Sequence, residues 1–351
     1  HALIQKGQIT KDNSTIVIRN LRKVYKGGKV ALKCMSLSFN NNECFALLGP
    51  NGAGKTTCVS MLTGLFSQTS GEAWVNGFSI KDQIDSVHEN MGFCPQFDVL
   101  WDYLTVREHL AFYSRMKGVP VTQEREHIKS ILNAVGLKSS AGTLSKFLSG
   151  GMRRRLSIGI SFVGNPGVVI LDEPTTGLDP SSKRQLWKVI YNAKRRGICL
   201  VLITHSMEEA EVLSDRIGIM AEGALHVLGS TLELKNKYGT GYRLTVNVTP
   251  TQEESLDKLI TPILPKAEIV SSFAGTIVYQ LNTAKISTVF SSMEQFKHDG
   301  LIVDWGMTQT TLEDVFISIV THASSRKRKI YIPWYKMGFY ILKDLLSRVQ
   351  S

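Results

Sequence analysis

The sequence predicts a chain of two folded parts: an α/β core with an inserted helical lobe, and a smaller α+β domain. Three observations support this prediction. A buried strand leads through a glycine-rich loop into a helix near residue 50, and a helical pattern interrupts the core from about 103 to 146. Strands and helices alternate again after residue 240. At 351 residues, the chain is long enough for two domains.

Composition and charge narrow the class of protein. Charged residues at 20% and hydrophobic ones at 43% are ordinary for a globular chain. The net charge is +11, but residues 321–351 carry +6 of it, with seven basic side chains and one acidic one. A nucleic-acid-binding domain is expected to spread basic residues over a folded face, so this distribution argues against nucleic acid as a partner.

Other features indicate the compartment. No cysteine pair has C-x-x-C spacing, which indicates a reducing environment; the five cysteines are at 34, 44, 58, 94 and 199. No apolar run reaches the roughly 18 residues that span a bilayer, and no signal peptide is visible. The chain begins at His1 rather than Met, from which we expect a fragment of a longer protein.

The glycine-rich loop is the strongest motif. It follows the apolar run 44–48 and consists of Gly49, Pro50, Asn51, Gly52, Ala53, Gly54, Lys55, Thr56 and Thr57. Glycines let successive N–H groups point into one concavity at a helix N-terminus, which suits phosphate. Lys55 is expected to neutralise the β- and γ-phosphates, and Thr56 to hold Mg²⁺. The alternative, a plain glycine turn, is weak because this spacing arises by chance in about one chain in a hundred.

Two later strands end in groups suited to phosphoryl chemistry. The apolar strand 168–171 ends at Asp172, which suits Mg²⁺, and Glu173, which can polarise an attacking water. The strand 198–203 is followed by Thr204 and His205. In an open parallel sheet His205 faces the same crevice and could contact the γ-phosphate, although a lone histidine is more often structural.

Three further candidates are weaker when taken alone. Ser149, Gly150 and Gly151 precede a helix and make a second possible phosphate site, or simply a capped helix. Tyr25 is expected on an early strand, where it could stack on adenine or serve only in packing. Gln96 is expected at the tip of the strand 91–96.

In this order, with Asp179 before His205, the motifs resemble the nucleotide-binding domain of ABC transporters. The resemblance covers about 14–235, after a linker at 1–13, and implies a P-loop NTPase core of ABC type with a helical subdomain at about 97–163. It implies ATP and Mg²⁺ as cofactors, with Thr56, Gln96 and Asp172 at the metal. It further implies that Tyr25 stacks on adenine, that Gln96 links the site to a membrane domain, that Glu173 is the catalytic base, and that His205 senses the γ-phosphate.

The A subfamily is the closest in pattern, on the residues Cys94–Asp98 and Leu104–Leu110. Met152 departs from most ABC proteins, which have glutamine there and so an additional amide contact. The A subfamily carries a small regulatory domain that ends in a run similar to Thr311–Phe316. Over 240–320 the sequence predicts a ferredoxin-like β-α-β-β-α-β order: strands 241–248, 267–273, 275–282 and 301–306, and helices 252–264 and 286–299.

The last segment, 321–351, is expected to lie at a membrane surface. It combines the basic run Arg326–Lys329 with aromatic residues and an amphipathic helix over 335–349. The alternatives are a helix packed on its own domain or a nuclear-localisation-like charge run. If the membrane reading holds, a transmembrane domain begins beyond Ser351 and this is the first nucleotide-binding domain of a tandem transporter.

We therefore expect an ATPase that powers a lipid-type ABC transporter at the cytoplasmic face of a membrane. Its expected partners are a second nucleotide-binding domain, which closes a composite site with its own Ser149–Gly151 motif, and transmembrane domains that handle the lipid. One alternative is a soluble ABC ATPase acting on nucleic acid or ribosomes. It is disfavoured because only about 90 residues separate the glycine loop from Ser149–Gly151, called the signature below, which is too few for a long coiled coil. It is also disfavoured because the chain has one such domain. Another is a nucleotide sensor without turnover, against which Glu173 and His205 argue.

Overall fold

The computed structural model describes residues 14–239, 241–248, 267–273, 275–281 and 286–328. The chain divides into two compact units, of which Gly229–Ser318 is one and the rest of the chain the other. All five cysteines are free thiols, four of them buried. No helix within the described ranges is long and apolar enough to cross a membrane.

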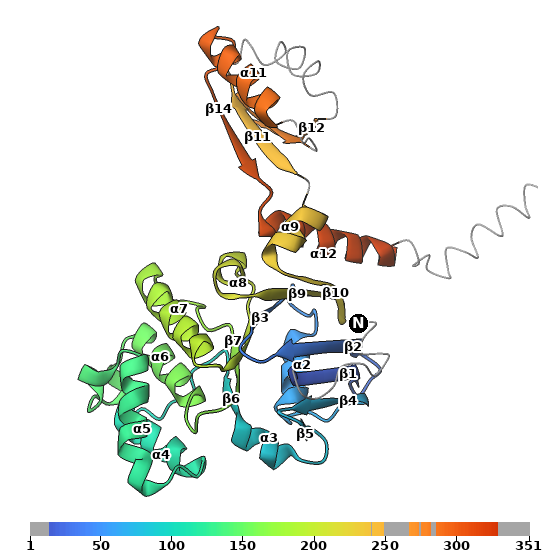
Figure 1. Ribbon diagram of the computed structural model, residues 1–351. Coiled ribbons are helices and arrows are strands. Elements are labelled where there is room, and N and C mark those ends of the chain that lie inside the picture. Colours follow the sequence, from blue (N-terminus) through green and yellow to red (C-terminus); the bar gives the residue numbers. More distant parts are fainter. Residues whose placement is uncertain (1–13, 240, 249–266, 274, 282–285, 329–351) are drawn as a thin grey trace, which may run out of the picture. The chain divides into compact units, whose positions relative to one another are not determined.

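A six-stranded sheet in the order β10-β9-β3-β8-β7-β6 forms the centre of the first unit (Figure 1). Its strands are β3 (Cys44–Leu48), β6 (Met91–Cys94), β7 (Val168–Asp172), β8 (Cys199–Ile203), β9 (Arg216–Ala221) and β10 (Ala224–Gly229). From β9 to β6 each strand is parallel to its neighbour, so their carboxyl ends lie along one edge. Strands β3, β7 and β8 are buried at every residue, which explains their unbroken apolar sequences.

The two faces of this sheet belong to two separate cores, because successive strand side chains alternate. On β7, Val168 and Ile170 belong to the core shared with the glycine-loop helix, while Val169 and Leu171 belong to the core of the helical lobe. Strand β8 divides in the same way. The six-stranded sheet thus packs on one face against the helical lobe and on the other against a second, smaller sheet.

The smaller sheet is antiparallel, in the order β2-β1-β4-β5, and covers the first face together with two helices. These elements are β1 (Ser14–Val24), β2 (Val30–Asn40), β4 (Ser70–Val75), β5 (Phe78–Ser79), α2 (Lys55–Leu62) and α3 (Ile84–Asn90).

The helical lobe covers the other face, on the opposite side from β1, β2 and β4 (Figure 1). It contains α4 (Val106–Met116), α5 (Val121–Ala134), α6 (Gly150–Ser161) and short 3₁₀ turns at Lys138–Ser140 and Ser145–Phe147. The helices predicted between 103 and 146 are confirmed. Helix α4 starts with a reciprocal capping box, in which Thr105 and Glu108 each accept a backbone N–H from the other. Helices α7 (Pro180–Arg195) and α8 (Met207–Leu213) complete the core.

The second unit contains an antiparallel sheet in the order β12-β13-β11-β14. The strands are β11 (Tyr242–Asn247), β12 (Glu268–Phe273), β13 (Thr276–Leu281) and β14 (Asp304–Gln309), and α11 (Ile286–His298) packs on them through Val289 and Met293. Helix α9 (Thr231–Tyr238) precedes this sheet. After it, Thr311 caps α12 (Leu312–Arg328), which runs well past the predicted Thr310–Phe316.

One predicted strand in this unit was wrong in position. Residues 301–306 were expected to be extended, but β14 starts three residues later, at Asp304. The reason is the end of α11: Gly300 adopts a left-handed φ of 70°, and the Leu301 N–H bonds back to the Phe296 carbonyl. Ile302 then enters the core as part of a loop. The linker at 1–13 and the predicted helices 252–264 and 335–349 lie outside the described residues.

Candidate active site

The glycine loop connects the central strand β3 to α2, which starts at Lys55. Its shape requires glycine at two positions. Gly54 has φ 104°, and a Cβ there would lie 2.7 Å from the Ala31 carbonyl oxygen. A Cβ on Gly49 would lie 2.5 Å from the Met220 carbonyl oxygen. The loop therefore fits against the β2 and β9 backbones only without side chains at these positions.

Lys55 lies under this loop. Its Nζ donates to the carbonyl oxygens of Gly49, at 2.6 Å, and Pro50, at 3.3 Å. Burial lowers the pKa of Lys55, while the carboxylates of Glu173 and Asp172 act in the opposite direction. Two of the three ammonium N–H bonds are thus used by the loop, which leaves one suited to a phosphate oxygen.

The acidic pair stands where β7 ends. Asp172 is buried, and burial and the charge of Glu173 raise its pKa, against Lys55 and Arg154. Glu173 follows with a left-handed φ of 45°, held by the bond from its N–H to the Ile203 carbonyl. A non-glycine residue with this φ is uncommon, and here it turns the side chain out of the strand direction.

The Glu173 carboxylate gathers side chains from three strand ends. Its Oε2 accepts from Nε2 of Gln96, at 3.0 Å, and from Oγ1 of Thr176, at 3.1 Å. Its Oε1 lies 3.2 Å from Nδ1 of His205. Gln96, Glu173 and His205 follow β6, β7 and β8, so the structure brings together three residues that the sequence predicted separately.

Arg154 holds the backbone at the ends of β6 and β7, a role that the sequence did not predict. The guanidinium, 4% exposed, donates to the carbonyls of Asp172 and Glu173 at 2.8 and 3.0 Å and to Pro174 at 2.9 Å. It also bonds the Pro95 carbonyl, at 2.7 Å, and the Asp98 carboxylate, at 3.1 Å. A single residue of α6 therefore ties the end of β6 to the end of β7. The run Arg153–Arg155, which follows the signature, is visible in the sequence. The sequence does not indicate which of these arginines is buried.

Ser149 and Asp179 both act as helix caps. The Ser149 hydroxyl accepts from Met152 N at 3.3 Å, with Gly150 and Gly151 in the first turn of α6. The Asp179 carboxylate accepts from Ser182 N at 3.0 Å, and the hydrogen bonds to Ser182 lower its pKa. Among the described residues, no hydrogen bond joins Ser149–Gly151 to the glycine loop or to Glu173, so these motifs are not assembled into one site within this chain.

Tyr25 lies in the turn just after β1, not on the strand as expected, because the Tyr25 N–H pairs with the Lys29 carbonyl in a tight turn. Its ring meets Phe66 edge to face at 5.9 Å, and its hydroxyl is 3.3 Å from Oγ1 of Thr57. This contact places the Tyr25 ring beside the first turn of α2.

The residues fit a magnesium ion held partly by phosphate. Thr56 is exposed at the loop, and Asp172 and Gln96 stand at neighbouring strand ends. The described residues contain no cluster of three His, Cys, Asp or Glu side chains that would hold a metal alone. Magnesium typically takes one or two carboxylates and completes its shell with substrate phosphates and water, which this set allows.

Comparison with known proteins agrees with this geometry. Residues 32–176 match the family described as ABC transporter. The fold is similar to a solved structure of an ATP-binding subunit of an ABC transporter, with a TM-score of 0.60, 25% identity, and coverage of 64% of this chain and 94% of that one. A dimeric ATP-binding cassette bound to ADP and Pi, 24% identical with a TM-score of 0.56 over 61% of this chain and 98% of that one, shares the fold. The chain contains an ABC transporter nucleotide-binding domain: a P-loop ATPase that binds ATP with Mg²⁺.

Its relatives narrow the class. ABC transporter A family member 7 of Arabidopsis thaliana is 44% identical over 320 residues, 88% of this chain and 34% of its own length. ABC transporter A family member 3 of the same plant is 43% identical over 338 residues, which are 93% of this chain and 36% of that protein's length. This is the ATPase domain of an A-subfamily ABC transporter, and the chain spans about a third of the length of the curated relatives it matches.

Proposed function

We propose that this chain hydrolyses ATP to drive lipid movement by an A-subfamily transporter, with Glu173 as the catalytic base. One observation carries the catalytic assignment: the Glu173 carboxylate is shared by Gln96 and His205 at the strand-end edge where the glycine loop also lies. These contacts fix the position of the carboxylate at that edge. A water placed there would donate a proton to Glu173 as it attacks the γ-phosphate.

The other residues take separate roles in this proposal. Lys55 and the loop N–H groups bind the phosphates, Tyr25 stacks on the base, and His205 contacts the γ-phosphate. Thr56, Gln96 and Asp172 hold Mg²⁺, which when bound neutralises charge on the phosphate oxygens. Asp179, exposed at the N-terminus of α7, is proposed to contact the nucleotide where the partner domain meets this one.

The site is completed by a second nucleotide-binding domain, either in the same longer chain or in a second copy. In support, Ser149 and Gly150 are exposed at the start of α6 and make no contact with the glycine loop of their own chain among the hydrogen bonds of the described residues. Their first-turn N–H groups suit the γ-phosphate of ATP held by a partner.

Transmembrane domains are the proposed output partner, and the surface next to Gln96 supports this. Phe97, Tyr103 and Phe147 are more than two-thirds exposed. Beside them a hollow of about 570 Å³ is lined by Leu100, Trp101, Asp102, Tyr103, Leu104 and Phe112. Exposed aromatic residues around a hollow are typical of a protein interface. Asp98 lies between this surface and Arg154, so a movement here would reach the Asp172 and Glu173 carbonyls.

The remaining proposals concern the domain boundaries, the cellular location and the substrate. The segment 14–235 is the catalytic domain with its helical subdomain at about 97–163, and 240–320 is a ferredoxin-like regulatory domain. Residues 321–351 hold the chain against an anionic membrane surface on the cytoplasmic side. The proposed substrate class is lipid, which is what the resemblance of the motifs to the A subfamily implies. No observation favours nucleic acid as a partner.

A concentration series tests the central proposal. With Mg²⁺ and saturating ATP, phosphate release per chain should rise with chain concentration, because each site needs two copies. Ser149→Arg should abolish that rise without weakening ATP binding to the monomer, since the substitution blocks only the partner half. Specific activity that is independent of concentration in the native chain would contradict a composite site.

A further inference from the structure

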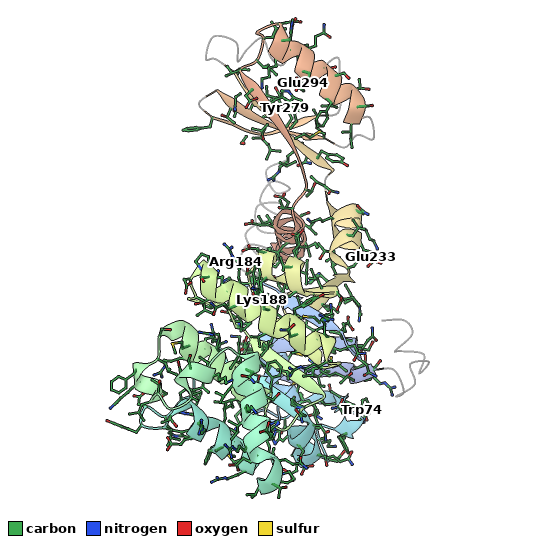
Figure 2. All side chains as sticks on the ribbon, turned by 60° about the vertical axis from the view of Figure 1, so that its left-hand side comes forward. Trp74, Arg184, Lys188, Glu233, Tyr279 and Glu294 are labelled. Carbon is green, nitrogen blue, oxygen red and sulfur yellow. The ribbon has the colours of Figure 1, made fainter. Side chains whose placement is uncertain are left out.

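Three helices of the first and second units begin with the same sequence pattern, a serine or threonine followed three residues later by glutamate. At Thr105 and Glu108, and at Ser230 and Glu233, the glutamate carboxylate accepts the N–H of the capping residue and closes a reciprocal box. Glu233 lies on α9 (Figure 2). The third pair, Ser206 and Glu209 at the start of α8, does not form this reciprocal box, because the Glu209 carboxylate does not accept the Ser206 N–H.

At α8 the N–H of the capping residue Ser206 bonds to a residue other than the glutamate. The Glu209 N–H still donates to the Ser206 hydroxyl, at 3.3 Å, but the Ser206 N–H donates to Oγ1 of Thr204, at 3.0 Å. The carboxylate of Glu209 is thereby released from capping and turns into the interior. It is 1% exposed, whereas Glu108 and Glu233 are at the surface. Helix capping does not explain a buried carboxylate.

The surroundings of Glu209 connect two segments of the active site. The hydroxyls of Thr204 and Thr175, both buried, face the carboxyl group. Thr204 precedes His205, and Thr175 comes two residues after Glu173. Neither carboxylate oxygen reaches a partner at hydrogen-bonding geometry among the described residues. The same two segments are also joined by the contact between Glu173 and His205, whose side chain is exposed, whereas Glu209 is buried.

Burial favours the neutral form of Glu209, and the charged groups around it oppose that effect. Burial is the largest influence and raises its pKa; the threonine hydroxyls, Lys183 of α7 and His205 act in the opposite direction. The third element packed here, β3, contributes only the Cys44 thiol, whose pKa burial raises to about 12. No ion pair of the described residues involves Glu209. A protonated carboxyl group can donate to one threonine and accept from the other, whereas an ionised one can only accept from both.

We propose that Glu209 is a positioning residue for ATP hydrolysis, whose buried carboxyl group links the Thr204–His205 segment to the Glu173–Thr175 segment. This inference rests on the proposed roles of Glu173 and His205. It predicts that Glu209 acts on the chemical step and not on ATP binding, because the glycine loop lies at a different strand end. It also predicts a pH effect, because loss of the proton would remove the donor and place a charge behind His205.

The test uses the full chain with Mg²⁺ and compares Glu209→Ala, Glu209→Gln and Glu233→Gln. Glu209→Ala should lower kcat at least tenfold while the ATP Kd stays within threefold. Glu209→Gln, which cannot ionise, should lack the decline in kcat that the native chain is expected to show as the pH rises. Glu233→Gln, the matched capping residue, should keep kcat and its pH profile within twofold.

A kcat for folded Glu209→Ala within twofold of the native value would overturn the proposal, as would a native pH profile in Glu209→Gln. If Glu209→Ala does not fold, the pH profile of Glu209→Gln decides alone. Failure of the underlying catalytic assignment is recognised separately, because Glu173→Gln would then retain turnover whatever the Glu209 variants do.

Discussion

Nδ1 of His205 lies 3.2 Å from Oε1 of Glu173, although the two residues follow different strands and are separated by a whole helix in the sequence. Parallel neighbours β7 and β8 place both at the same edge, and the left-handed backbone at Glu173 turns its carboxylate toward the histidine. The contact joins the proposed catalytic base to the residue proposed to contact the γ-phosphate, and several consequences of these assignments can be measured.

Glu173→Gln should abolish turnover and preserve ATP binding, because an amide keeps the shape of the side chain but cannot accept the proton of the attacking water. The loss of a general base costs about 100- to 10,000-fold in rate. Lys55→Ala should lose both binding and turnover. Phosphate release and equilibrium nucleotide binding separate the two effects, and full hydrolysis by Glu173→Gln would refute the assignment.

Arg154→Met should destabilise the first unit and also lower the hydrolysis rate. The substitution leaves four backbone carbonyls and the Asp98 carboxylate without their donor in a buried place, for which about 3–5 kcal/mol is expected. Denaturant unfolding measures the loss. Arg184→Met is the matched control, since Arg184 is exposed on α7 (Figure 2) and should change stability by less than about 0.5 kcal/mol.

The helical lobe should lose stability in mild acid through His109. This side chain is fully buried; its Nε2 accepts from Trp101 N at 2.9 Å, and its Nδ1 bonds the Thr105 carbonyl. Burial is the main cause that lowers its pKa, so protonation favours the unfolded state. The stabilisation is complete above the ordinary histidine pKa of about 6.5 and is lost as pH falls below it.

This pH effect can be followed by unfolding the native chain and His109→Gln between pH 7.5 and 5. The native chain should lose stability across this interval, and the variant should start lower but change less. Because Trp101 stacks on His109 at 5.7 Å, its fluorescence gives a local signal. Parallel pH curves for the two proteins would show that His109 is not the group responsible.

Tyr25→Ala should weaken ATP binding, whereas Tyr25→Phe should change it little because the ring remains. Stacking of a base on an aromatic side chain is worth about 1–3 kcal/mol, which corresponds to about 5- to 150-fold in Kd. Fluorescence titration with ATP and with triphosphate lacking the base is the measurement. Equal losses for both ligands would indicate that Tyr25 acts through Thr57 and the loop, and not on adenine.

Changing Arg326, Lys327, Arg328 and Lys329 together to glutamine should weaken binding to anionic vesicles by about 100-fold or more, given about 1 kcal/mol per basic residue near such a surface. Neutral phosphatidylcholine vesicles serve as the control, on which both proteins should bind equally weakly. Unchanged binding of the variant to anionic vesicles would contradict the membrane-surface proposal for 321–351.

Local signals explain what could be predicted from the sequence. The glycine loop, the acidic pair and the signature are each contiguous, so glycine spacing, an apolar run and a helix cap are enough to recognise them. The order of strands in the parallel sheet was not derivable in this way. The error at β14 has a similar cause: Ile302 is apolar and extended-looking, and only the core of the second unit decides that it lies in a loop.

The sequence by itself thus determined that this protein binds a nucleoside triphosphate and to which family it belongs, because those properties reside in short runs of residues. Only the tertiary structure decided which polar side chains turn inward. Three arginines follow the signature, and of these Arg154 alone is buried against the strand ends. Among the described helices, α4, α8 and α9 have a glutamate three residues after a serine or threonine cap, and of these glutamates Glu209 alone is buried in the core. The local patterns are the same in each set. The difference arises from what the fold packs against them, since a buried polar group depends on partners that are distant in the chain.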